Sequence, residues 1–183
     1  MPDNRFRGVV LVAEDDDDDF VLIQSAFAQA QMPGELRRVK DGVELLQYLR
    51  LEGAFEDRVS APEPALILLD LNMPRKDGRE ALHEIRADSQ LRSQPVVVLT
   101  TSRTAEDVVG SYRLGANSFI SKPVGYRQLA RVMEVLRSYW FDTAELPAPR
   151  SLKGAVSPVP RDECGDTAPG AVQLSLPDLV GRR

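Results

Sequence analysis

The stretch ALILLDLNMPRKDG, residues 65–78, decides the fold class of this chain. Its first five residues are apolar without a break, which is typical of a strand buried on both faces of a parallel sheet. Asp70 follows at once, and Lys76-Asp77-Gly78 then begins a helical segment in which Asp77 is a suitable N-cap. A buried strand, a polar turn and a helix in succession predict one unit of an α/β fold.

Similar units repeat along the chain between residues 8 and 141. The expected strands are residues 8–13, 36–40, 65–69, 95–100 and 117–121. The segments between and after them have apolar residues at helical spacing, most clearly Leu129, Val132, Met133, Leu136 and Trp140. Leu114-Gly115 is a signal for the end of a helix. Five strands alternating with five helices predict a doubly wound parallel sheet covered on both faces.

Composition limits the classes of function. The net charge of −5 opposes a broad nucleic-acid surface. One Cys and one His exclude an internal disulfide and a zinc-type cluster, so any metal must be held by oxygen ligands. The chain has no signal-peptide pattern and no run of about 18 uncharged apolar residues, the length that spans a bilayer. We therefore expect a cytoplasmic protein that binds neither nucleic acid nor membrane.

A change in composition near residue 146 divides the chain of 183 residues. Residues 146–183 hold six of the thirteen prolines, four glycines and no aromatic residue, which is too little apolar mass to offset the entropy of ordering. We expect a domain over residues 1–145 and a mostly disordered tail without an output domain. Within that tail, residues 172–176 are a candidate docking strand, and Cys164 is an ordinary exposed thiol.

Polar residues stand at the carboxyl ends of the predicted strands. In chain order they are Glu14, Asp15, Asp70, Thr100 and Lys122. Each alone has an ordinary explanation as a cap, a strand residue or a solvated charge. Ligands of an open α/β sheet collect at this edge, however, and clustered carboxylates repel unless a hard cation or a fixed ammonium stabilises them.

These residues, in this order, resemble the receiver domain of two-component response regulators. The matching motifs are residues 12–15, residues 68–74 with Asp77-Gly78, residues 98–102 and residues 121–123. The intervals match as well, with 30 residues from Asp70 to Thr100 and 22 from Thr100 to Lys122. The likeness covers residues 8–141 and implies the flavodoxin-like or CheY-like strand order 2-1-3-4-5.

The resemblance implies that a histidine kinase transfers a phosphoryl group to Asp70 in a reaction that requires Mg²⁺. The implied metal ligands are Asp15 and Asp70 directly, Glu14 mainly through water, and the backbone carbonyl of Asn72. Lys122 then pairs with Asp70 before the transfer and with the phosphoryl group after it. No turnover of a separate substrate is expected.

The same resemblance assigns the response to phosphorylation. Thr100 hydrogen-bonds a phosphoryl oxygen, and Phe119 turns inward into the vacated space, although an aromatic residue in a strand can also be ordinary core. Asn72 and Ser102 stand where the family tunes self-dephosphorylation. The signal reaches the surface of the fourth helix, fifth strand and fifth helix, for contact with a downstream protein, a phosphorelay partner or a second copy of the chain.

Three features narrow the resemblance to single-domain regulators that accompany phytochrome-type histidine kinases. They are the long segment 51–64, the sequence Asn-Met-Pro-Arg-Lys-Asp-Gly at residues 72–78 and the ending Ser-Tyr-Trp-Phe at residues 138–141. Tyr139 and Trp140 are helix-packing residues or contributors to a dimer surface. The histidine kinase partner is therefore expected to be of the phytochrome type.

Five consecutive aspartates, Asp15 to Asp19, leave the metal-binding register to the strand before them. Setting Glu14 and Asp15 directly after residues 9–13 puts Phe20, Ile23 and Phe27 on the buried face of the first helix. Residues 17–19 then fall in its first turn, where negative charge complements the helix dipole. Asp16 is ambiguous between the two roles.

Two other classes of function stay open. A pseudo-receiver would act as a scaffold without phosphorylation, but it has no physical reason to keep a cluster of like charges. A phosphohydrolase would use Asp70 as nucleophile, but it lacks a second aspartate two residues on and a cap domain. The single histidine, His83, is expected to be a solvated residue of a polar helix face.

Overall fold

The computed structural model describes residues 8–147. Five parallel strands form one sheet in the order β2-β1-β3-β4-β5, which confirms the predicted topology. The strands are β1 (Val9–Ala13), β2 (Glu35–Val39), β3 (Pro64–Leu69), β4 (Val96–Thr100) and β5 (Ser118–Ser121). The predicted tail from residue 146, with Cys164 and the candidate strand 172–176, lies almost entirely outside the described residues.

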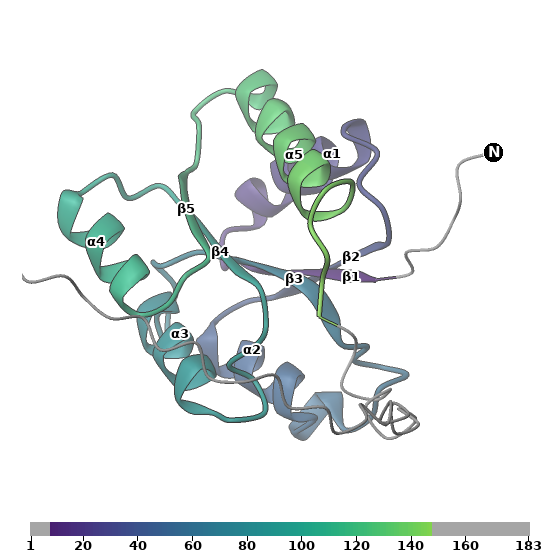
Figure 1. The fold of residues 1–183 in the computed structure, drawn as a ribbon, viewed down its shortest axis with the longest axis vertical. Helices are drawn as coiled ribbons and strands as arrows, with labels where there is room; N and C mark the ends of the chain where they lie inside the picture. Colours follow the sequence, from purple (N-terminus) through teal and green to yellow (C-terminus); the bar gives the residue numbers. More distant parts are fainter. Residues whose placement is uncertain (1–7, 148–183) are drawn as a thin grey trace, which may run out of the picture.

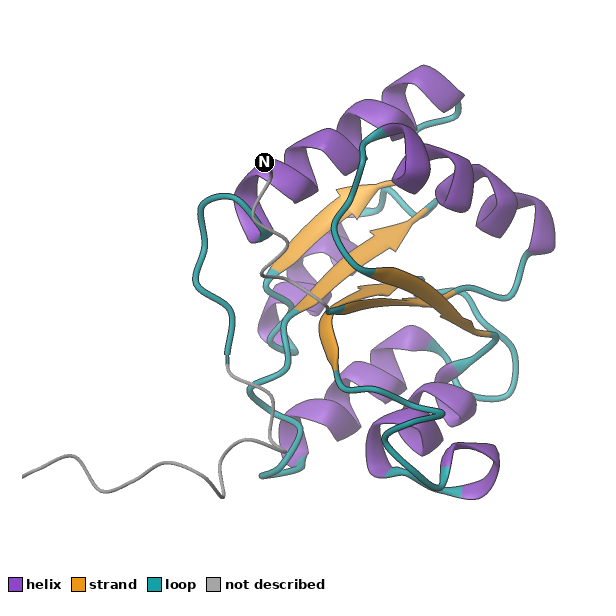
Figure 2. Cartoon of the chain, turned by 90° about the vertical axis from the view of Figure 1, so that its right-hand side faces the viewer, coloured by secondary structure: helices purple, strands orange, loops and turns teal. Residues whose placement is uncertain are grey.

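Helices cover both faces of the sheet (Figures 1 and 2). They are α1 (Asp17–Gln29), α2 (Gly42–Arg50), the 3-10 turn η1 (Gly53–Phe55), α3 (Gly78–Ala87), α4 (Ala105–Arg113) and α5 (Tyr126–Trp140). Helices α1 and α5 lie side by side on one face, and α2 and α3 pack on the other. None of the helices within residues 8–147 is long and apolar enough to cross a membrane.

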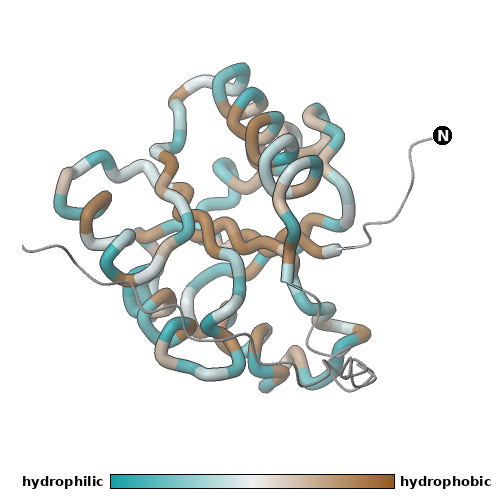
Figure 3. The backbone as a smooth tube through the Cα atoms, in the orientation of Figure 1, coloured by the Kyte–Doolittle hydropathy of each residue, from teal (hydrophilic) through white to brown (hydrophobic). Residues whose placement is uncertain are grey.

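The central strands β1, β3 and β4 are the most apolar part of the molecule (Figure 3). Alternate residues of β1 belong to two separate cores, with Val10 and Val12 facing α1 and α5, and Leu11 and Ala13 facing α2 and α3. This double burial explains the unbroken apolar run in the sequence. Because β1 and β3 are neighbours, the residues that follow them emerge at the same edge.

Local sequence signals fix most helix ends. Asp77 caps α3 in a capping box with Glu80, as predicted. Residues Asp17, Asp18 and Asp19 form the acidic first turn of α1, as predicted, and Asp16 is the N-cap. Gly115 follows α4 with a φ of 93°, a conformation that favours glycine.

The three residues predicted for the buried face of α1 lie on that face at different depths. Ile23 and Phe27 are buried, but Phe20 is only partly buried at the margin of the core. The guanidinium of Arg38 lies over its ring, 4.8 Å from the centroid. A cation stacked on the ring face keeps Phe20 at the boundary between core and solvent.

Candidate functional site

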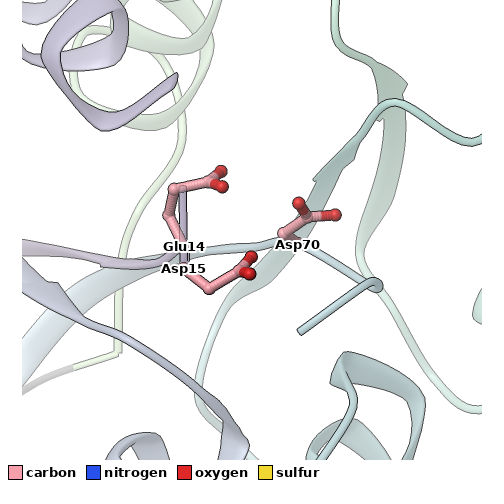
Figure 4. Close-up of side chains that lie close together, drawn as sticks. All are labelled: Glu14, Asp15 and Asp70. Atoms are coloured by element: carbon pink, nitrogen blue, oxygen red, sulfur yellow. The ribbon is translucent and has the colours of Figure 1, made fainter. Parts of the chain in front are cut away.

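Three carboxylates converge where β1 and β3 end. Glu14 and Asp15 follow β1 and Asp70 follows β3, and Figure 4 shows the three side chains close together. One oxygen from each lies within 4.8 Å of the others. Glu14 is 1% exposed and Asp70 6%, whereas Asp15 is open to solvent. Asp70 is held in place by its own N–H, which donates to the Ala13 carbonyl at 3.0 Å.

The chemistry of this cluster fits a hard divalent cation. Two carboxylates about 5 Å apart at an effective dielectric constant near 20 repel by roughly 3 kcal/mol. Positive charge placed among the three carboxylates therefore stabilises the cluster. All of its donors are oxygens, the ligands that Mg²⁺, Mn²⁺ and Ca²⁺ prefer. One open carboxylate beside two buried ones leaves a side from which a hydrated ion can enter.

Lys122 is the ammonium that lies against this cluster. Its Nζ donates to Asp70 Oδ2 at 3.0 Å, to Asp19 Oδ2 at 2.9 Å and to Glu14 Oε2. The side chain is 7% exposed. The Lys122 N–H donates to the carbonyl of Thr100 at 2.6 Å, which ties the end of β5 to the end of β4.

Burial and charge set the protonation of this pair. Burial raises the pKa of Glu14 to about 7, although the hydrogen bond and charge of Lys122 oppose the rise. Burial acts to lower the pKa of Lys122, but the carboxylates of Asp70 and Glu14 outweigh it and raise that pKa above its ordinary value. Lys122 therefore stays charged, and burial makes Glu14 easier to protonate than an exposed glutamate.

The remaining predicted site residues lie around the cluster in different ways. Thr100 is fully buried at the end of β4, and the N–H of Ser102 lies 3.4 Å from its Oγ1. The Ser102 hydroxyl donates to Asp107 in α4. Asn72 donates its N–H to Asp70 Oδ1 at 3.2 Å, and its side chain is exposed.

Phe119, Trp140, Tyr139 and His83 lie farther from the cluster. Phe119 is partly buried in β5 and packs against the core on the side of α2 and α3. Trp140 packs against the other core, while Tyr139 is 56% exposed. His83 is exposed, as predicted.

Two residues at the site were not predicted from the sequence. Asp19 contacts Lys122 in addition to lying in the acidic first turn of α1. Arg38 of β2 donates to the carbonyls of Glu14 and Asp15 at 2.8 and 2.9 Å. No pattern in the sequence indicates either contact, because each joins residues that lie far apart along the chain.

Comparison with known proteins gives consistent results. The model of the family described as response regulator receiver domain matches residues 10–134. Response regulator Rcp1 of Synechocystis sp. (strain ATCC 27184 / PCC 6803 / Kazusa) is 39% identical over 140 residues, which is 76% of this chain and 93% of Rcp1.

Solved structures agree with that match. The phosphorylated cyanobacterial phytochrome response regulator RcpA is 42% identical, with a TM-score of 0.72 over 78% of this chain and 100% of RcpA. The Mn²⁺-bound form of response regulator Rcp1 is 39% identical, with a TM-score of 0.70 over 77% of this chain and 99% of Rcp1.

Proposed function

Because this chain belongs to the response regulator receiver domain family, we propose that it accepts a phosphoryl group from a histidine kinase on Asp70 and signals through protein contacts. The observation that carries the proposal is the buried pair of Asp70 and Lys122 beside Glu14 and Asp15. A buried carboxylate kept next to a fixed ammonium is a suitable acceptor for an anionic group. We place the receiver domain at residues 1–145.

In the transfer, an oxygen of Asp70 forms a bond to phosphorus as the bond from phosphorus to the kinase histidine nitrogen breaks. The products are an acyl phosphate on Asp70 and a neutral imidazole. Lys122 neutralises charge on Asp70 before the step and on the phosphoryl oxygens after it. Thr100 supplies a hydroxyl donor from the neighbouring strand. Water later hydrolyses the acyl phosphate, so the chain itself turns over no separate substrate.

Glu14, Asp15, Asp70 and the backbone carbonyl of Asn72 are the groups that would hold Mg²⁺. When bound, the ion supplies positive charge for the phosphoryl oxygens and offsets the repulsion among the three carboxylates. Asp15 is exposed and therefore stays accessible to an ion that keeps most of its water shell. Support for a divalent ion at this place comes from the Mn²⁺-bound form of Rcp1.

The response to phosphorylation is proposed to run through β4 and β5. Thr100 moves toward the phosphoryl group, and Phe119 fills the space left behind. Ser102 moves with the same loop, and its contact with Asp107 couples that loop to α4. Together with Asn72, Ser102 sets the rate of self-dephosphorylation. The changed surface of α4, β5 and α5 then contacts a downstream protein, a phosphorelay partner or a second copy of the chain.

Intact-mass spectrometry tests the acceptor directly. Incubation with Mg²⁺ and acetyl phosphate is expected to add one base-labile phosphoryl group to the wild type and none to Asp70→Asn. The matched control is Asp88→Asn, which changes a carboxylate outside the cluster and is expected to react like the wild type. No adduct with acetyl phosphate or with any of a panel of histidine kinases would favour a binding module that works without phosphorylation.

The kinase partner is proposed to be of the phytochrome type, which rests on the likeness to RcpA and Rcp1. Transfer rates from several radiolabelled histidine kinases to this chain test that step. We expect a phytochrome-type kinase to be the fastest donor. A faster transfer from a kinase of another type would contradict the proposed phytochrome-type partner, while the proposal that Asp70 is the acceptor would still stand.

A further inference from the structure

The five-aspartate run raises the question of what selects one aspartate for the metal site. We propose that Arg38 is the positioning residue that fixes the backbone of Glu14 and Asp15, so that Asp15 alone of the run faces Asp70. This inference rests on the proposed function, because it concerns how the same metal-binding carboxylates are held.

Arg38 contacts the backbone of the loop between β1 and α1, where the metal-binding carboxylates begin. Its Nε donates to the carbonyl of Glu14 at 2.8 Å and its Nη2 to the carbonyl of Asp15 at 2.9 Å. These two carbonyls lie between the end of β1 and the start of α1, where neither a strand ladder nor a helix satisfies them. A planar guanidinium can bind two adjacent acceptors at once, whereas a lysine ammonium has no such fork.

The guanidinium is itself held firmly. The Arg38 side chain is 14% exposed, its Nη1 donates to Asp17 Oδ1 at 2.5 Å, and it stacks on the ring of Phe20. The parallel register pairs Arg38 with Val12, two residues before Glu14. Arg38 therefore transmits the position of β2 to the loop that carries the carboxylates.

The other aspartates of the run are directed elsewhere. Asp16 caps α1 by accepting the N–H of Asp19 at 2.8 Å, and Asp17 pairs with Arg38 and Lys40. Asp18 is exposed on α1, and Asp19 pairs with Lys122. Without the two carbonyl contacts of Arg38, the loop could turn and bring Asp16 toward the place of Asp15.

Mn²⁺ affinity of the full chain, measured by isothermal titration calorimetry, tests the role of Arg38. Loss of a cation near the site favours Mn²⁺ binding by Coulomb's law, so a purely electrostatic role predicts that Arg38→Met binds more tightly. We expect the opposite, a weakening by about 10-fold to 100-fold, as is usual when a group that orients metal ligands is removed. Tighter or unchanged binding would overturn the proposal.

Arg37→Met is the matched control, because Arg37 lies next to Arg38 in β2 and bonds to Glu35 and Ser60 instead. It removes the same charge and is expected to leave Mn²⁺ affinity unchanged. If the wild type binds no Mn²⁺ and takes up no phosphoryl group, the proposed function fails. If the wild type does both and Arg38→Met matches its affinity, only the role of Arg38 fails.

A second comparison separates positioning from general support of the fold. Asp15→Asn and Asp16→Asn are made in the wild type and in Arg38→Met, since asparagine still caps a helix as well as aspartate. In the wild type, Asp15→Asn is expected to weaken Mn²⁺ binding far more than Asp16→Asn. In Arg38→Met the difference in Mn²⁺ affinity between the two asparagine variants is expected to be smaller, because the freed loop can bring another carboxylate to the metal. An unchanged difference would show that Arg38 does not decide which aspartate binds the metal.

Discussion

Replacement of Lys122 by methionine is expected to destabilise the metal-free protein by about 3–5 kcal/mol, the usual cost of removing one partner from a buried ion pair. Lys122 contacts Glu14, Asp19 and Asp70, and two of these carboxylates are almost completely buried. Without the ammonium, no other ion pair among residues 8–147 offsets the mutual repulsion and desolvation of Glu14 and Asp70. Urea unfolding in the presence of a chelator measures the loss.

Mg²⁺ is expected to restore part of that stability, because a cation that binds the folded state and not the unfolded chain stabilises it by mass action. The matched control is Lys76→Met. Lys76 pairs with Glu84 where both side chains are about one-third exposed, and such pairs contribute about 0–1 kcal/mol. An equal decrease in the free energy of unfolding in Lys122→Met and Lys76→Met would contradict the view that Lys122 offsets the charge of a buried acidic cluster.

The second large effect is expected from Gly78→Ala. A Cβ at Gly78 would lie 2.0 Å from the carbonyl oxygen of Asp70 and 2.9 Å from the Cα of Leu71. Both neighbours are backbone atoms, so the β3 to α3 loop must move as a unit. Overpacking of this kind costs about 1–3 kcal/mol, and we expect the upper end because no flexible side chain can give way.

The same substitution is expected to slow uptake of a phosphoryl group from acetyl phosphate by about 100-fold, since a displacement near 1 Å at a reacting group has effects of that size. Gly110→Ala is the control, because its added Cβ in the middle of α4 meets no atom within 4 Å apart from its chain neighbours and the backbone of its own helix. It is expected to raise stability by about 0.5–1 kcal/mol and leave phosphorylation unchanged. Wild-type stability and rate in Gly78→Ala would refute the steric argument.

The sheet was predictable because its signals are local and repeated. Unbroken apolar runs marked β1 and β3, and the strand order followed from the receiver motifs at the strand ends. The observed strand ends differ from the predicted ones by about one residue. At such ends a side chain can accept the backbone hydrogen bond that a neighbouring strand would otherwise accept. Lys40, for example, was expected in a strand, but its N–H donates to Glu44 Oε2 instead.

The candidate site was partly predictable for the same reason. Parallel strands bring their carboxyl ends to one edge, so the topology alone placed Glu14, Asp15 and Asp70 together. Arg38 could not be found in this way. Its contacts depend on the register between β1 and β2 and on the path of a loop, neither of which leaves a pattern in the sequence.

Phe20 shows the opposite limit. Helical spacing correctly put it on the same face as Ile23 and Phe27, but it lies at the margin of that core, where the guanidinium of Arg38 is over its ring. Periodicity identifies the face of a helix and not the depth of each residue on that face. The partly buried position follows from the contact between α1 and the end of β2.

The central claim is that Asp70 itself takes the phosphoryl group, and borohydride trapping followed by peptide mapping tests it most directly. Borohydride reduces an acyl phosphate to an alcohol, which converts a phosphorylated aspartate to homoserine. After incubation with acetyl phosphate and Mg²⁺, we expect homoserine at position 70, and none when a chelator is present. Homoserine at another aspartate, or its absence from every peptide of a phosphorylated sample, would contradict the account.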